Sequence, residues 1–180
     1  MDKALPMTTN IVKLNVLREY CFTQFRDINL ILREEIKTKQ DFDEKYREVY
    51  GEGTTSERLF NTFLLNIELL DELFEDCKIN QEIVVYRKFS SKNFSKFEVG
   101  HIFTDQGFIS TCVNKDSLKN VLHSDVLSYD SIATIIVKKD TPCVYIGDVF
   151  GRKESELLLT RNLKFKVTSK KNNEVQLEIV

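Results

Sequence analysis

The chain contains no tryptophan, and its few cysteines and histidines are too scattered to form a recognisable metal motif. It has neither a Cys-x-x-Cys pair nor two closely spaced histidines. This spacing argues against a zinc site and is typical of a protein from a reducing compartment. We therefore expect no metal cofactor. The residues concerned are Cys21, Cys77, Cys112, Cys143, His101 and His123.

Long apolar segments are missing too. The first residues, MDKALPMTTNIVKL, lack the continuous apolar run of a secretory signal peptide, and no segment approaches membrane-spanning length. We expect a protein that acts in the cytoplasm or is delivered into a host cytosol, and that does not bind a membrane. The formal net charge is -2, from 26 basic and 28 acidic residues, so nucleic acid is not expected as a partner.

The length bounds the number of domains. The chain has 180 residues, of which 42% are hydrophobic. This composition is enough for one packed core, and the chain is too short for two domains of ordinary size. We predict a monomer with a single domain over residues 1–180. Its composition changes along the chain, with a helical part over about 1–78 and a β-rich core over about 79–180.

The first half has helical periodicity. Apolar residues recur every three or four positions over residues 11–32, which predicts an amphipathic helix or helix pair that Thr8 or Thr9 can cap. A second periodic segment covers 41–50, and a third covers 57–76, with Ser56 as its N-cap. The predicted buried positions are Ile11, Leu14, Leu17, Cys21, Phe25, Ile28, Leu32, then Phe42, Tyr46, Val49, and then Leu59, Phe63, Ile67, Leu70 and Phe74.

The second half is rich in β-branched and aromatic residues. Strands are predicted over residues 82–89, 107–112, 131–139, 143–146, 155–159, 163–169 and 174–180, with a hairpin loop at KKNN and a short helix over 117–126. Helices come first and strands follow, with few β-α-β alternations. This order predicts an α+β fold in which N-terminal helices pack on a mixed, mostly antiparallel β core made of two sheets.

Three short signals are weak when each is taken alone. Arg87 lies in a predicted strand, where it is either solvent-facing or able to grip a phosphate with two hydrogen bonds. Ser110 and Thr111 end a strand, either as β-tolerant hydroxyls or as donors that orient a carboxylate. Glu154 and Glu156 are two residues apart, so in an extended chain they point to the same side, either toward solvent or into a site.

In combination, these signals resemble the arginine–serine–glutamate class of mono-ADP-ribosyltransferases. The branch they resemble is that of the bacterial exoenzyme toxins, C3-like and binary actin-modifying. The strand arginine matches Arg87, Ser-Thr-Ser matches residues 110–112 with Cys112 in place of the last serine, and Glu-x-Glu matches residues 154–156. The segment ELLLTRNLKFKV matches the family's tail. An upstream pattern matches at Tyr20, Ile28, Asn29, Leu32 and Arg33, so the resemblance covers about residues 10–180.

The resemblance implies a reaction and a set of roles. ADP-ribose would move from NAD to an arginine side chain of a target protein, with release of nicotinamide. Glu156 would stabilise the oxocarbenium-like transition state, and Ser110 would orient Glu156. Glu154 would accompany modification of arginine, where a glutamine accompanies modification of asparagine. The implied catalytic residues are Glu156, Glu154, Ser110 and Arg87.

The resemblance also implies how NAD and the target bind. Arg87 would clamp the pyrophosphate, Arg33 would make a second phosphate contact, and Asn29 would give polar support. Phe150, in the loop before the glutamates, either packs on the target or anchors its own loop. The residues implied to bind NAD are Arg87, Arg33, Asn29, Ser110, Thr111 and Glu156, and those implied to recognise the target are Phe150 and Glu154.

Two other functions stay open at this point. The chain could be an NAD glycohydrolase, with water as the acceptor, or a catalytically inactive NAD-fold module that binds a partner. Retention of Arg87, Ser110 and Glu156 argues against the inactive module, because an inactive copy has no reason to keep all three.

Overall fold

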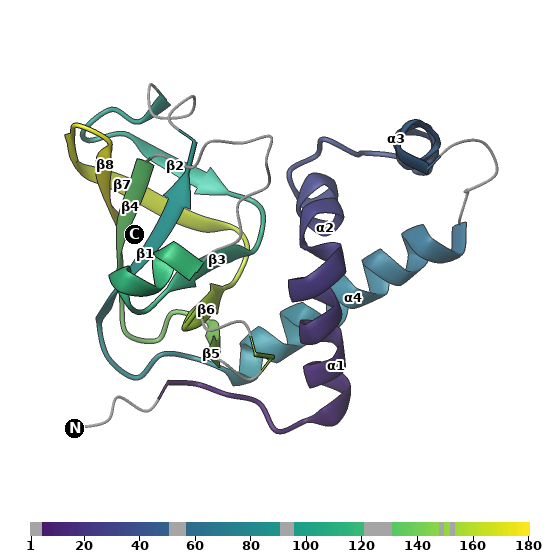
Figure 1. Ribbon diagram of the computed structural model, residues 1–180, viewed down its shortest axis with the longest axis horizontal. Coiled ribbons are helices and arrows are strands. Elements are labelled where there is room, and N and C mark those ends of the chain that lie inside the picture. Colours follow the sequence, from purple (N-terminus) through teal and green to yellow (C-terminus); the bar gives the residue numbers. More distant parts are fainter. Residues whose placement is uncertain (1–4, 51–56, 91–95, 121–130, 148–149, 152–153) are drawn as a thin grey trace. The chain divides into compact units, whose positions relative to one another are not determined.

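The computed structural model describes residues 5–50, 57–90, 96–120, 131–147, 150–151 and 154–180 (Figure 1). The chain divides into two compact units. One comprises Thr8–Leu73, and the other comprises Phe74–Val180 with the first residues of the chain. The change from helix to strand falls between Asp76 and Ile83, as the composition predicts. The single domain remains a prediction.

The helical unit follows the predicted order of segments. Its elements are α1 (Ile11–Glu19), the π-helical turn η1 (Tyr20–Gln24), α2 (Phe25–Leu32), α3 (Lys39–Tyr50) and α4 (Glu57–Asp76), whose last residues belong to the second unit. The prediction for residues 57–76 is confirmed at both ends. In the part of the chain that the structure describes, no helix is both long and apolar enough to cross a membrane.

The cap of α1 differs from the prediction. The side chain of Asn10 accepts hydrogen bonds from the backbone N–H groups of Val12, at 3.0 Å, and Lys13, at 3.2 Å. Thr8 instead accepts a hydrogen bond from the Asn10 N–H. The expectation that Thr8 or Thr9 caps the helix is therefore wrong. Asparagine is among the best N-cap residues, and it immediately precedes the first helical residue.

The predicted stripe over residues 11–32 is interrupted. Leu17, Cys21 and Ile28 are buried as expected, but Phe25 is 52% exposed. The π-helical turn explains the difference, because its wider hydrogen-bonded ring rotates the residues that follow it out of the regular 3.6-residue register. Ile11, in the first turn of α1, is also exposed.

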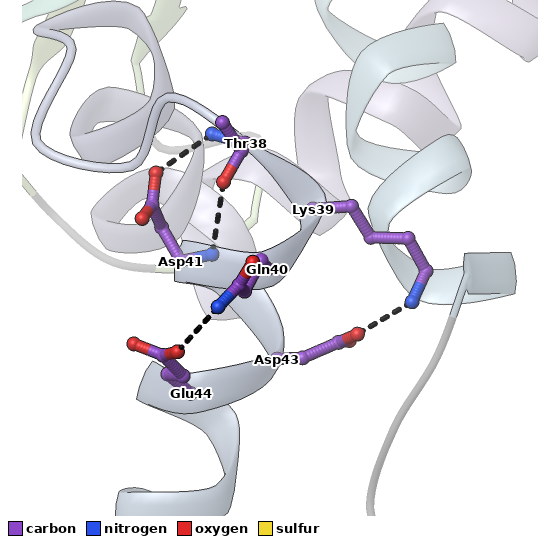
Figure 2. Close-up of polar contacts among 6 residues, drawn as sticks. All are labelled: Thr38, Lys39, Gln40, Asp41, Asp43 and Glu44. Carbon is purple, nitrogen blue, oxygen red and sulfur yellow. Dashed lines mark hydrogen bonds and ion pairs between the residues drawn. The ribbon is translucent and has the colours of Figure 1, made fainter.

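The start of α3 is held by reciprocal hydrogen bonds (Figure 2). The Asp41 carboxylate accepts from the N–H groups of Thr38, at 2.8 Å, and Lys37, at 3.0 Å, while the Thr38 hydroxyl accepts from the Asp41 N–H. These bonds, those with Thr38 above all, lower the pKa of Asp41. Lys39 and Asp43 add an ion pair one turn apart. This capping box explains why the helix begins two residues before the predicted segment.

Aromatic packing joins α3 to α4. The Phe42 ring is fully buried and its centroid lies 4.2 Å from Tyr46, 5.1 Å from Phe60 and 5.7 Å from Phe63. Phe42, Tyr46 and Phe63 thus face inward as predicted. The side chain of Val49 and the predicted cap Ser56 lie outside the described residues.

The second unit is built on strands. Those described are β1 (Ile83–Phe89), β2 (Ile102–Asp105), β3 (Ile109–Cys112), β4 (Ser131–Val137), β5 (Cys143–Gly147), β6 (Glu156–Leu159), β7 (Leu163–Lys171) and β8 (Glu174–Ile179). All seven predicted strands are present. The short helix predicted over 117–126 begins as a 3-10 helix, η3 (Lys115–Asn120), and its remainder lies outside the described residues.

These strands form one sheet in the order β2-β7-β8-β4-β1-β3-β6-β5 (Figure 1). Among the strands that the structure describes, only β4 and β8 pair in parallel. The predicted mixed, mostly antiparallel core is therefore confirmed, but hydrogen bonds join all strands where we expected two sheets. The junction is narrow, because β1 and β3 pair only at Tyr86 and Cys112.

Both sides of this junction share one core. Val85 of β1, Ile135 of β4, Leu157 of β6 and Phe165 of β7 belong to the same buried cluster. Strands on either side of a narrow junction can enclose a common apolar volume. The pattern of apolar residues in the sequence did not reveal that the two groups of strands share one core. Burial of each such side chain stabilises the fold by about 1.5–3 kcal/mol.

Strand β2 was missed by the sequence patterns. Its first residue, Ile102, is 53% exposed, and the strand pairs only with β7 at the edge of the sheet. A four-residue strand with its isoleucine toward solvent lacks the alternation that marks a half-buried strand. The hairpin between β7 and β8 is confirmed, with Asn172 at a φ of 53° in the turn.

Candidate active site

The pairing of β3 with β6 brings Ser110 and Glu156 together. Cys112 lies opposite Glu156 and Ser110 opposite Leu158, so the period of two places Ser110 and Glu156 on the same face. The Ser110 hydroxyl donates a hydrogen bond of 2.5 Å to Oε1 of Glu156. Glu156 is buried, with only 3% of the residue exposed. A buried carboxylate is thus held in one orientation by a neighbouring strand.

Arg87 reaches the same serine from β1. Its Nη1 donates a hydrogen bond of 2.8 Å to the backbone oxygen of Ser110, and the arginine is half-buried. Its other guanidinium N–H groups make no further hydrogen bond to the residues described. Ser110 therefore contacts Arg87 through its backbone and Glu156 through its side chain. The structure brings these three predicted residues together.

Thr111 faces the other side of the same strands. Its hydroxyl donates a hydrogen bond of 2.6 Å to the backbone oxygen of Leu157, directly opposite on β6. Leu157, Leu158 and Leu159 are all fully buried. These contacts hold the register of β3 and β6, on which the alignment of Ser110 with Glu156 depends.

Glu154 lies just before β6, and the residue is 3% exposed. The extended geometry assumed from the sequence does not hold here, because Ser155 has a φ of 48°, in the left-handed region. Glu154 and Glu156 are therefore not neighbours along an extended strand. Both glutamates are buried, so the alternative in which they point toward solvent from an exposed strand start is wrong.

Gly147 is a site residue that the sequence patterns did not reveal. It pairs with Glu156 where β5 bulges, and its φ is 56°. A Cβ atom at this position would lie 2.7 Å from Cε1 of Tyr145. Only glycine satisfies both the conformation and the space, so it shapes the strand beside Glu156. The only signal was a glycine after the apolar run CVYI.

The remaining predicted residues are not linked to these three by the contacts described. Asn29 belongs to the helical unit, where its Nδ2 donates a hydrogen bond of 2.9 Å to the Tyr20 hydroxyl, and Arg33 ends α2 in the same unit. Phe150 is half-buried and precedes Gly151. Asp148, Val149, Arg152 and Lys153 of the predicted recognition loop lie outside the described residues. The roles of Asn29, Arg33 and Phe150 stay predictions.

This arrangement suits one kind of chemistry. A buried carboxylate in a fixed orientation can stabilise positive charge that develops on a bound molecule. A guanidinium that has N–H groups without a hydrogen bond to the described residues can bind an anionic group. Among the described residues, no group of three or more His, Cys, Asp or Glu side chains could hold a metal ion.

Comparisons with known proteins place the chain in a family. The model of the ADP-ribosyltransferase exoenzyme family matches residues 3–179. The NAD(+)–arginine ADP-ribosyltransferase EFV of Enterococcus faecalis is 29% identical over 158 residues, which is 86% of this chain. The chain spans only 28% of the length of that relative.

Solved structures share the fold at lower identity. One is the ADP-ribosylating toxin BECa of a binary enterotoxin of C. perfringens, with NADH, at a TM-score of 0.66 and 18% identity over 95% of this chain and 44% of BECa. Another is the ADP-ribosyltransferase Vis in complex with agmatine, at a TM-score of 0.63 and 17% identity over 99% of this chain and 79% of Vis. At these identities the likeness concerns the fold alone.

Proposed function

Because the chain belongs to the ADP-ribosyltransferase exoenzyme family, we propose that it transfers ADP-ribose from NAD to an arginine side chain of a target protein and releases nicotinamide. The contact of Ser110 with Glu156, with Arg87 bonded to the same serine, carries this proposal. Two similarities support arginine as the acceptor. The curated relative is named an arginine transferase, and Vis binds agmatine, which has the guanidino group of arginine.

NAD binding would depend first on Arg87. A planar guanidinium whose remaining N–H groups make no hydrogen bond to the described residues matches the paired oxygens of a pyrophosphate. Its bond to the Ser110 backbone holds the side chain in place before the substrate arrives. Arg33 would make a second phosphate contact, and Asn29 would give polar support. Thr111 would act on NAD binding only indirectly, because its hydroxyl holds β3 against β6 through the bond to Leu157.

Cleavage breaks the bond between the ribose C1′ atom and the nicotinamide nitrogen. The bonding electrons leave with nicotinamide, and positive charge develops on the ribose as an oxocarbenium-like transition state. Glu156 would accept a hydrogen bond from the ribose 2′-hydroxyl and offset that charge. The Ser110 bond keeps the carboxylate in this orientation.

Transfer then forms a bond between a guanidinium nitrogen of the target and C1′. A protonated guanidinium is a poor nucleophile, so a base must take up a proton as the bond forms. Glu154 would pair with the guanidinium and accept that proton. A glutamine at this position could orient the acceptor but could not accept the proton.

The acceptor would be a protein, with Phe150 packing on its surface. The net charge of -2 supports a protein target over a nucleic acid. We further propose that the protein works as a monomer, without a membrane and without a metal ion, in the cytosol of the producing cell or of a host.

Paired measurements test this function. Nicotinamide release is measured without an acceptor, and incorporation of labelled ADP-ribose is measured with agmatine. For the wild type we expect both activities. Glu154→Gln should keep nicotinamide release, since Glu156 still offsets the ribose charge, and should lose labelling of agmatine. Glu98→Gln is the matched control and should keep both, because this glutamate is exposed and none of the described contacts links its side chain to Arg87, Ser110 or Glu156.

The other outcomes separate the alternatives. Nicotinamide release by the wild type without labelling of agmatine or of host protein would indicate an NAD glycohydrolase. No release under any condition would indicate an inactive NAD-fold module. Unchanged labelling of agmatine by Glu154→Gln would refute the role of Glu154.

A further inference from the structure

Ser155 separates the two glutamates and has an unusual backbone conformation. Its φ of 48° lies in the left-handed region, which residues with a Cβ atom seldom adopt and for which serine has no special preference. Surrounding contacts must therefore hold this conformation. It decides in which direction the chain runs from Glu154 to Glu156.

Two contacts hold Ser155, and both come from the segment just after β3. The Val113 N–H donates a hydrogen bond of 3.0 Å to the backbone oxygen of Ser155. The Ser117 hydroxyl donates one of 3.2 Å to the Ser155 hydroxyl. Ser117 is itself 8% exposed, in η3.

The turn that presents Ser117 is in turn well fixed. The N–H of Ser117 donates to the backbone oxygen of Asn114, at 3.1 Å, and the N–H of Asp116 donates to the Asn114 side chain, at 2.9 Å. The Ser117 hydroxyl therefore starts from a defined position and is not a mobile surface group.

The same short stretch of chain thus serves both glutamates. Ser110, in β3, holds the carboxylate of Glu156, and Ser117, seven residues later, holds the residue next to Glu154. We propose that Ser117 is a positioning residue that keeps Glu154 aligned for the acceptor guanidinium, and so sets how ADP-ribose divides between arginine and water. This inference rests on the proposed function.

The test is the ratio of agmatine labelling to nicotinamide release in Ser117→Ala. We expect labelling to fall about three- to tenfold, the range expected for loss of one neutral hydrogen bond, through kcat and not through the KM for NAD. Nicotinamide release without acceptor should stay near the wild-type rate, because Ser110 and Glu156 are untouched. Ser117→Thr, which keeps a hydroxyl, should restore most of the labelling. Ser169→Ala, an exposed serine of β7, should change neither activity.

A second variant covers the case in which Ser117→Ala does not fold. Ser155→Gly removes the hydroxyl that Ser117 binds, and glycine tolerates positive φ without strain, so the fold should survive while the alignment is loosened. It should show the same selective loss of labelling. Equal losses of labelling and release, or an unchanged ratio in both variants, would overturn the inference. Those results differ from failure of the proposed function, in which the wild type itself neither releases nicotinamide nor labels agmatine.

Discussion

Replacement of Ser110 by alanine tests the central contact of the site. The variant removes the hydroxyl that donates to Oε1 of Glu156 at 2.5 Å and leaves the backbone oxygen that accepts from Arg87. It should therefore separate orientation of the carboxylate from binding of NAD. We expect a large fall in the rate of nicotinamide release with little change in the KM for NAD.

The size of the fall follows from the burial of Glu156. A hydrogen bond to a charged group contributes about 1.5–3 kcal/mol, and the 3% exposure of Glu156 leaves little room for water to replace the lost donor. If all of this is expressed in the transition state, kcat falls about 10- to 150-fold, at roughly 1.36 kcal/mol per tenfold. Any part of this hydrogen-bond energy that already stabilises the free folded enzyme appears instead as lower thermal stability of the variant.

The assay is nicotinamide release by the purified variant, with thermal unfolding measured in parallel. Ser110→Thr keeps a hydroxyl and should recover part of the rate. Thr168→Val is the matched control, since it also removes a hydrogen-bonding hydroxyl from the same sheet, but one that donates to a backbone oxygen, that of Gln176 at 3.3 Å, and not to a carboxylate. It should lower stability by about 0.5–1.5 kcal/mol and leave the rate unchanged. A wild-type rate for Ser110→Ala would refute the view that this bond orients the catalytic carboxylate.

Three further predictions concern single groups. Arg87→Ala should weaken NAD binding by about 1.5–3 kcal/mol through loss of a charged contact, and wild-type affinity by calorimetry would contradict the role of Arg87. Glu156→Gln should fold and bind NAD, since glutamine can still accept a hydrogen bond from Ser110. It should lose both nicotinamide release and transfer. Nicotinamide release at the wild-type rate would exclude Glu156 as the catalytic group. The lowered pKa of Asp41 means that its stabilisation of α3 is present above its unfolded pKa and is lost as pH falls through the lower folded value. Hydrogen exchange at the start of α3 should therefore be faster in Asp41→Asn than in the wild type near neutral pH, with the difference vanishing in strong acid; a difference that persists in acid would count against the capping role.

Local periodicity was enough to predict much of the fold. α4 begins and ends where its apolar stripe does, because an amphipathic helix buries one face whatever its partner. The strands over β1, β4 and β7 are recognisable because β-branched and aromatic residues suit a pleated, half-buried surface. The hairpin at Asn172 follows from the tolerance of asparagine for positive φ. Arg87, Ser110 and Glu156 were likewise singled out from the sequence, since their order along the chain matches a family pattern, and the structure brings the three together.

Other features depend on partners far away in the sequence. β4 pairs in parallel with β8, and β1 meets β3 at a single junction. The residues near these strands in the sequence contain no pattern that indicates either pairing. Strand β2 exists because β7 offers it an edge, although its own residues lack the pattern. The φ of Ser155 is held by Val113 and Ser117, both about forty positions earlier in the chain. The local sequence around Ser155 cannot predict this φ, because the contacts that stabilise it exist only once the strands have paired.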